Sequence, residues 1–181
     1  VRSENGASNT VLDAGYVPGR RVAELTATAT NAVLDGFTLQ RGGGNAEMMG
    51  GGILLLAGTV QNCVIQSNDV MREPKGAGIC MSGGTVSNCT IRANKHSGYY
   101  FGGGGIYMTG GLVTRSTIAD NMEAFVYEFG SGGGGGIHTY GGIVDRCVIA
   151  HNRSYSLGAG IHAEGTAVIR NCLLLGNEAL A

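Results

Sequence analysis

The stretch Gly103-Gly104-Gly105-Ile106, followed by Ser116-Thr117-Ile118-Ala119-Asp120-Asn121, decides the fold of this chain. It joins a glycine-rich entry, an apolar residue, a short segment of alternating polar and apolar residues, and an asparagine. Four further copies of the unit carry their isoleucine at Ile53, Ile79, Ile137 and Ile161. Repeats with a period of about 20–50 residues predict a solenoid, in which each copy stacks on the one before it.

The spacing within a copy is nearly constant, whereas the spacing between copies varies. The distance from the isoleucine to the Cys or Ser that opens the second motif is identical in four copies and longer by one position in the last, from Ile161 to Cys172. The return from the asparagine to the next isoleucine is shortest from Asn152 to Ile161 and longest from Asn121 to Ile137. Stacked strands must stay in register while loops on the rim need not, so we expect a fixed arc and a variable arc in every coil.

Local periodicity favours strands. In the second full copy, Ile79 and Met81, and then Cys89 and Ile91, follow the period of two that sends alternate side chains to one face. Glycine makes up 34 of 181 residues and opposes helices. Parallel strands need long crossovers, which are right-handed. We predict an all-β fold, a right-handed parallel β-helix (solenoid) of about six to seven coils with three short strands per coil.

We expect residues 1–181 to form a single β-helix domain, with degenerate leading coils over residues 1–44 and regular coils over 45–181. The letters Val-Leu-Asp occur at 11–13 and again at 33–35, which suggests one coil between them. Leu39 aligns with Ile65 of the next coil, and Gly42 takes the place of the later asparagines. The chain opens at Val1 without a visible signal peptide, so we expect it to be a piece of a longer protein.

Charge and composition limit the classes of partner that the chain can have. The chain has 12 basic and 13 acidic residues, without a basic stripe for nucleic acid. No apolar run approaches the roughly 20 residues of a membrane-spanning helix. We therefore expect no nucleic-acid partner and no membrane span in this segment, and the sequence leaves the oligomeric state open.

Two columns of identical residues are expected along the stack. One is an asparagine ladder at a turn, which satisfies polar groups that stacking would bury; its members are Asn68, Asn94, Asn121, Asn152 and Asn177. The other is a column of small buried thiols, with Ser116 taking the place of one cysteine; its members are Cys63, Cys89, Cys147 and Cys172. Stacked neighbours about 4.8 Å apart lie near the edge of disulfide geometry, so we expect reduced cysteines.

The paired motifs resemble the repeat of polymorphic outer membrane proteins, found in bacterial autotransporter passengers and adhesins. Gly103-Gly104-Gly105-Ile106 with Ile118-Ala119-Asp120-Asn121 looks like that pair, although this chain places Ile or Leu where the family favours Phe. The chain is also similar to right-handed β-helix repeat proteins with the pectin-lyase-like fold. The resemblance implies an extracellular or bacterial outer-membrane location, and a scaffold that carries both enzymes and adhesins.

Catalysis on such a scaffold would need carboxylates that converge on one face. The acidic residues are scattered along the chain, so we expect no complete active site and no cofactor, and catalytic residues are predicted at none of its positions. His138 and His162 follow the glycine-run isoleucines in successive copies and should lie roughly 5 Å apart on the outer surface. They would hold a metal ion only with a third ligand, which the sequence does not identify. His96 and His151 have no partner that the sequence can place.

The variable arcs carry most of the aromatic residues, as a candidate binding patch: Tyr99, Tyr100, Phe101, Phe125, Tyr127, Phe129 and Tyr155. The alternative is that these loops fold back as a small core of their own. We predict a non-catalytic bacterial surface or secreted module, an adhesin or scaffold, whose rim loops bind glycans or a host or cell-surface protein. The alternatives are a polysaccharide lyase or hydrolase whose catalytic residues lie mostly outside this segment, and a pure spacer.

Overall fold

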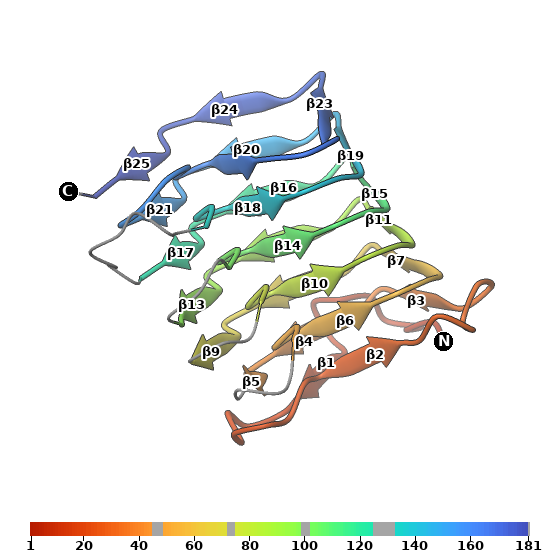
Figure 1. The fold of residues 1–181 in the computed structure, drawn as a ribbon. Coiled ribbons are helices and arrows are strands. Elements are labelled where there is room, and N and C mark those ends of the chain that lie inside the picture. The colour runs from red at the N-terminus through yellow and green to blue at the C-terminus, as the bar shows by residue number, and fades with distance from the viewer. Residues whose placement is uncertain (45–48, 72–74, 99–101, 125–132, 181) are drawn as a thin grey trace.

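The computed structural model describes residues 1–44, 49–71, 75–98, 102–124 and 133–180. Their strands stack into a parallel β-solenoid with the N-terminal rungs at one end and the C-terminal rungs at the other (Figure 1). Every strand-to-strand ladder is parallel, and each strand inside a sheet pairs with its counterparts one rung earlier and one rung later. The predicted β-helix is confirmed. These described residues form no helix long and apolar enough to cross a membrane.

Each rung contributes one strand to each of four sheets, named sheets 1 to 4 in chain order. Sheet 1 contains β2 (Ala23–Leu25), β6 (Ile53–Leu55), β10 (Ile79–Met81), β14 (Ile106–Met108), β18 (Ile137–Thr139) and β22 (Ile161–Ala163). Sheet 2 contains β3 (Val33–Asp35), β7 (Thr59–Gln61), β11 (Thr85–Ser87), β15 (Leu112–Thr114), β19 (Ile143–Asp145) and β23 (Val168–Arg170).

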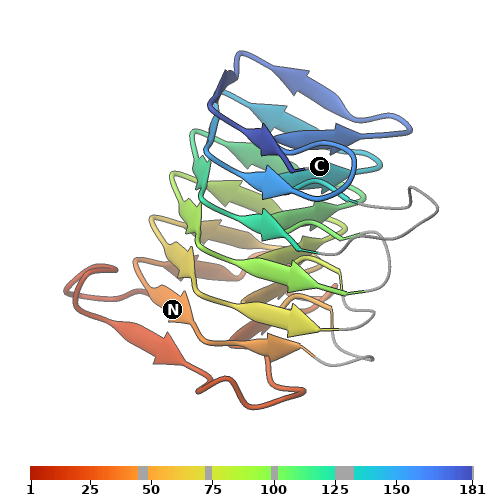
Figure 2. The same cartoon turned by 90° about the vertical axis from the view of Figure 1, so that its left-hand side faces the viewer.

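Sheet 3 contains β1 (Val11–Asp13), β4 (Thr38–Gln40), β8 (Val64–Gln66), β12 (Thr90–Arg92), β16 (Thr117–Ala119), β20 (Val148–Ala150) and β24 (Leu173–Leu175). Sheet 4 contains β5 (Gly43–Gly44), β9 (Asp69–Met71), β13 (Lys95–Ser97), β17 (Met122–Glu123), β21 (Arg153–Ser154) and β25 (Glu178–Ala179). The strands of the four sheets follow one another around the solenoid (Figure 2).

Each complete rung has four strands and not the predicted three, and the additional strand belongs to sheet 4. From β9 onward its strands follow the ladder asparagines directly, and they mix polar with apolar residues, as Asp69-Val70-Met71 in β9 and Lys95-His96-Ser97 in β13 show. They lack the apolar alternation that marks the other three sheets. They stay extended because backbone groups of the rung below are already in register at the corner, as in the bond from the Lys95 amide to the Asn68 carbonyl (2.9 Å). These segments are strands because their backbones hydrogen-bond to the neighbouring rungs, and not because of the pattern of their side chains.

The leading coils differ from the sequence-based alignment in one respect. Leu12 in β1 pairs with Leu39 in β4, whereas Leu34 in β3 pairs with Val60 in sheet 2. The two Val-Leu-Asp segments therefore lie in different sheets, and the prediction of one coil between them is wrong. The alignment of Leu39 with Ile65 is confirmed by the β4–β8 register.

Three of the four corners have an almost constant length from β6 onward. A pair of residues joins sheet 2 to sheet 3, and another pair joins sheet 3 to sheet 4, in every complete rung. The first residue of each pair has a positive φ, for example 53° at Asn62 and 51° at Ala93. A left-handed residue between two extended ones turns the chain sharply, at a cost of roughly 1–2 kcal/mol for a side chain other than glycine. The stacked ladders on both sides offset that cost.

The fourth corner, between sheet 4 and sheet 1, carries the length variation; we call it the variable corner. It runs over 155–160 in the shortest case and over 124–136 in the longest. Its end in each copy is the glycine run. In every copy but the last, the glycine before the isoleucine meets both the next rung and the asparagine ladder. A Cβ on Gly105 would lie 2.6 Å from the Gly136 carbonyl oxygen and 2.9 Å from Asn121 Nδ2. No side chain fits there.

The core is a single apolar column inside the four sheets. Eight fully buried isoleucines of sheets 1 and 3 recur in it from rung to rung: Ile53, Ile79, Ile106 and Ile137, and Ile65, Ile91, Ile118 and Ile149. Each meets an identical or similar side chain one rung away, as in the Ile79–Ile106 pair. Burial of such a side chain stabilises the fold by roughly 1.5–3 kcal/mol, which makes this column the main support of the stack.

Candidate functional site

His138 and His162 occupy the middle of β18 and β22 and are direct register partners. Because strands of one sheet point matched residues to the same face, both imidazoles leave sheet 1 on the side away from the main core. Their ring centroids are 4.7 Å apart and their planes differ by 26°, a stacked arrangement. The predicted adjacency of the two histidines is therefore present in the structure.

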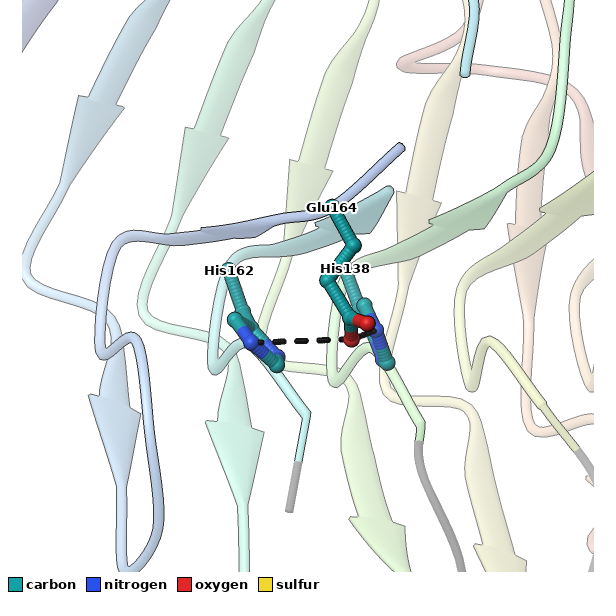
Figure 3. A group of neighbouring side chains, drawn as sticks. All are labelled: His138, His162 and Glu164. Atoms are coloured by element: carbon teal, nitrogen blue, oxygen red, sulfur yellow. Dashed lines mark hydrogen bonds and ion pairs between the residues drawn. The ribbon is translucent and has the colours of Figure 1, made fainter. Parts of the chain in front are cut away.

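Glu164 completes this cluster, which we call the His–Glu cluster (Figure 3). It lies directly after β22, at the corner toward sheet 2, and one carboxylate oxygen reaches both rings. Glu164 Oε1 is 3.3 Å from His138 Nε2 and 3.6 Å from His162 Nε2. The corner runs over 164–167 here and over 140–142 in the rung before it, one position shorter. That extra position lengthens the spacing from Ile161 to Cys172, and it is the signal in the sequence that marks this corner.

Neither histidine lies on the open surface, where their positions in the sequence predict both. The side chain of His138 is fully buried and that of His162 is 18% exposed, whereas Glu164 is 40% exposed. Burial, and then the neighbouring His162, lower the pKa of His138 to about 4. His138 is therefore neutral near pH 7, and its contact with Glu164 is a hydrogen bond to a carboxylate, not an ion pair.

The outer face of sheet 1 carries a second apolar cluster that supports His138. Leu54, Cys80 and Tyr107 are buried along the same column, one per rung. The Tyr107 ring meets the His138 ring edge-on, with centroids 5.4 Å apart, and the centroid of the Tyr140 ring lies 4.9 Å from that of His138. These contacts bury the side chains on the outer face of sheet 1, which would be exposed to solvent in an isolated strand.

The five predicted ladder asparagines form a continuous chain of amide hydrogen bonds. Asn94 Nδ2 donates to Asn121 Oδ1 at 2.9 Å, and Asn121 Nδ2 donates to Asn152 Oδ1 at 3.0 Å. Each Oδ1 also accepts from a backbone amide of the previous rung, such as that of Asn94 (3.1 Å). At the start, the Gly42 amide donates to Asn68 Oδ1. The ladder is structural, and it satisfies buried corner groups.

The cysteine column is also structural. Cys63, Cys89, Cys147 and Cys172 stand at the second position of the corner between sheets 2 and 3 and carry free thiols. Each thiol donates to the carbonyl two positions earlier, at 3.1 Å in Cys63. Ser116 Oγ makes the same bond to Thr114 at 2.8 Å, which explains why serine fits the column. Burial raises the pKa of Cys147 to about 11, which leaves its thiol protonated.

His96, for which the sequence offered no partner, has one in Glu123. They pair in register across β13 and β17, and His96 Nδ1 is 2.8 Å from Glu123 Oε2. Both side chains are fully or almost fully buried. Gly102 packs on the imidazole so closely that a Cβ would lie 2.4 Å from His96 Cε1. A buried pair under a closed backbone offers no room to a substrate, so we assign it to the fold.

Most of the predicted aromatic patch lies outside the described residues. Tyr155 is described; it follows β21 at the start of a variable corner and is 37% exposed. Tyr99, Tyr100, Phe101, Phe125, Tyr127 and Phe129 are not described, so the patch stays a prediction.

Several acidic side chains of the described rungs link neighbours in the stack. Asp13 binds Arg41 and Gln40 in the next rung, at 2.6 Å to Arg41 Nη2. Asp145 receives hydrogen bonds from Arg170 and Asn171 of the following rung. Within the described part of the chain, the structure brings three potential metal ligands together only at the His–Glu cluster.

Comparison with known proteins places this architecture in a family. A model described as a right-handed β-helix region matches residues 26–180, most of the chain. Comparisons with curated proteins and with solved structures gave no match. The repeats, the four parallel sheets and this match together show that the chain belongs to the right-handed β-helix family.

Proposed function

We propose that this chain is a non-catalytic β-helical module of a bacterial surface or secreted protein, which holds binding loops along one edge of a rigid stack. The observation that carries the proposal is the confinement of length variation to one corner. From β6 onward three corners keep or nearly keep their length, while the variable corner grows from 155–160 in its shortest copy to 124–136 in its longest. A constant rod with variable loops on one side is an arrangement that separates stability from recognition.

The use of the acidic residues supports a scaffold over a hydrolase or lyase. Asp13, Asp35 and Asp145 accept hydrogen bonds from side chains of the next rung. Carboxylates that serve as acid and base must instead face one bound sugar from two sides, about 5–10 Å apart. In the described rungs these three acids contribute to stacking.

The proposed location rests on a resemblance between sequence repeats. The Gly-Gly-Gly-Ile and Ile-x-x-Asn pairs resemble repeats of polymorphic outer membrane proteins, and we extend that likeness to an adhesin or scaffold exposed outside the cell. The partner class we propose is a glycan or a host or cell-surface protein, contacted by the variable corners.

Glycan and cell-surface binding by the purified chain tests the proposal. We expect saturable binding that is lost when Tyr100 and Tyr127 are both changed to Ser, with the circular dichroism spectrum and urea midpoint unchanged. Val148→Ser is the matched control, because Val148 is 37% exposed on sheet 3, away from the variable corner. Release of reducing or unsaturated sugar ends would favour an enzyme, and absence of any binding would favour a spacer.

A further inference from the structure

The His–Glu cluster has the donor set of a metal centre. Two imidazole nitrogens and one carboxylate oxygen lie within 4.8 Å of one another. Imidazole with carboxylate suits zinc and its neighbours among the divalent transition metals, whereas calcium and magnesium prefer oxygen ligands alone. The chemistry of the three groups therefore selects the class of ion.

The distances also fit. A tetrahedral zinc ion with bonds of about 2.0–2.2 Å holds its ligand atoms roughly 3.3–3.5 Å apart. Glu164 Oε1 lies 3.3 Å from His138 Nε2 and 3.6 Å from His162 Nε2, so two edges of such a tetrahedron are nearly in place. Figure 3 shows the Glu164 carboxylate beside the His138 ring, with dashed lines that join it to both histidines.

Burial differs among the three residues in a way that suits an open site. His138 is buried against the Tyr107 and Tyr140 rings, whereas Glu164 is 40% exposed. An ion can approach along the glutamate, and water can fill the remaining coordination position, as it does where three protein ligands hold zinc. The buried His138 ring would then be a ligand with a fixed orientation, and the exposed Glu164 carboxylate would be free to adjust its position.

We propose that His138, His162 and Glu164 bind a divalent transition-metal ion of the zinc class on the outer face of sheet 1. Because the stacked rings differ by only 26° in plane, their lone pairs run side by side and do not converge. Binding therefore turns one imidazole about its Cβ–Cγ bond. His162 is the ring that turns, since it is 18% exposed and His138 is fully enclosed.

The site is independent of the proposed adhesive function. It lies at the junction of sheets 1 and 2, around the corner after β22, whereas the variable corner joins sheet 4 to sheet 1. A metal here would cross-link the rungs of β18 and β22 and stabilise the C-terminal part of the stack, because an ion that binds only the folded state adds to its stability.

Calorimetric titration of the whole, chelator-treated chain with Zn²⁺ tests the proposal. We expect one ion per chain, and binding weakened at least about tenfold in His162→Ala and in Glu164→Gln, since loss of even an outer-shell partner costs that much. His151→Ala is the matched control, an exposed histidine at the corner between sheets 3 and 4, and should bind as the original chain does. Ca²⁺ should not compete.

Co²⁺ absorption separates this site from the thiols. Ligation by nitrogen and oxygen gives visible bands without the intense near-ultraviolet charge-transfer band of a thiolate. Thermal melts of each variant without metal check the fold, and Glu164→Gln keeps the test valid should His162→Ala unfold. The proposal is overturned by absence of saturable binding, by equal affinity in folded Glu164→Gln, or by a thiolate band that assigns the ion to the cysteines.

Discussion

At the scale of single residues, the asparagine ladder shows how one side chain can serve two rungs at once. Asn121 Oδ1 accepts from the amide and the side chain of Asn94, while its Nδ2 donates to Asn152 and to the Ile91 carbonyl. All of these groups are buried. The bonds run in one direction along the stack. Loss of the Asn121 side chain would therefore remove the acceptor of two Asn94 donors, whereas Asn152 Oδ1 would keep the bond from the Asn121 backbone amide.

Replacement of Asn121 by Ala should therefore be costly. Each buried polar group left unpaired costs about 1–3 kcal/mol, and Asn94 alone loses an acceptor for two donors, so we expect a loss of roughly 3 kcal/mol or more. Urea unfolding measures it. Asn88→Ala is the control: Asn88 bonds Asn62 in an exposed position, and its loss should cost about 1 kcal/mol, mainly from its left-handed backbone. Equal losses in the two variants would refute the ladder's role.

The buried His96–Glu123 pair makes a second prediction at this scale. Removal of one partner from a buried pair costs about 3–5 kcal/mol, whereas apolar replacement of both is often close to neutral. Val70 occupies the same column in the rung before His96, so valine fits the site. We expect His96→Val and Glu123→Val each to destabilise the fold, and the double variant to lose at least about 1 kcal/mol less than the sum.

The control for that cycle lies in the same sheet. Arg153 and Glu178 pair across β21 and β25 at 3.2 Å, but both side chains are more than half exposed. Exposed pairs couple by about 0.2–1 kcal/mol, so the corresponding valine cycle should give a small term. A coupling at His96–Glu123 no larger than this one would show that burial adds nothing to the pair.

At the scale of elements, the corners differ in what they tolerate. From β7 onward, the corners between sheets 2 and 3 and between sheets 3 and 4 consist of a left-handed residue and then a Cys, Ser or Asn, which is buried in every rung but the last. An added residue there would shift the following strand by one position and turn its apolar side outward. The variable corner lacks that constraint because its two flanking strands are positioned independently by their ladders.

Insertion of Gly-Ser-Gly-Ser tests this difference. Between residues 128 and 129, in the longest variable corner, it should change the free energy of unfolding by less than about 1 kcal/mol, because loop-closure entropy grows only with the logarithm of length. Between Asn88 and Cys89 it should disrupt the rungs that follow. Circular dichroism and urea midpoints report both results, and a similar loss at the two sites would contradict the assignment of the variable corner.

The sequence was informative where a residue's role repeats and uninformative where the role is particular to one rung. The register of the isoleucines, the asparagine ladder and the thiol column recur in several copies, so spacing alone places them. Sheet 4 escaped prediction because its short strands share no apolar alternation from rung to rung. Glu164 escaped because its reach toward two rings depends on side-chain direction at a corner. The burial of His138 depends on Tyr107 and Tyr140, whose positions around the ring follow from the stacking and the corner.

At the scale of the whole molecule, aspartates tie successive rungs together at the surface. Hydrogen bonds from Arg41 and Gln40 lower the pKa of Asp13 from 3.8 to about 2. Bonds from Asn62 and Gln61 lower the pKa of Asp35, and Asn171 lowers that of Asp145. A group whose pKa falls on folding stabilises the folded state above its unfolded pKa, and this stability is lost as pH falls through the folded value.

Acid should therefore weaken the stack between about pH 4 and pH 2. We expect the urea midpoint to fall across this window and the fall to be smaller in Asp13→Asn, which cannot gain a proton there. The urea midpoints of both chains are also measured at about pH 6, well above this window. The difference there gives the stability lost because Asp13→Asn weakens the contact with Arg41, independently of protonation. An identical pH dependence in the two chains would show that the Asp13–Arg41 link contributes nothing.

The variable corner has a further consequence for the affinity of the binding proposed above. The strands of sheets 4 and 1 that flank successive variable corners lie one strand spacing apart, about 4.8 Å, so the corners leave and rejoin the rod along a single edge. A partner that is itself a chain of repeating units would meet several corners at once, and contacts too weak to hold alone would reinforce one another through avidity. Lengthening the row by whole rungs would then tighten attachment stepwise, without improving any individual contact.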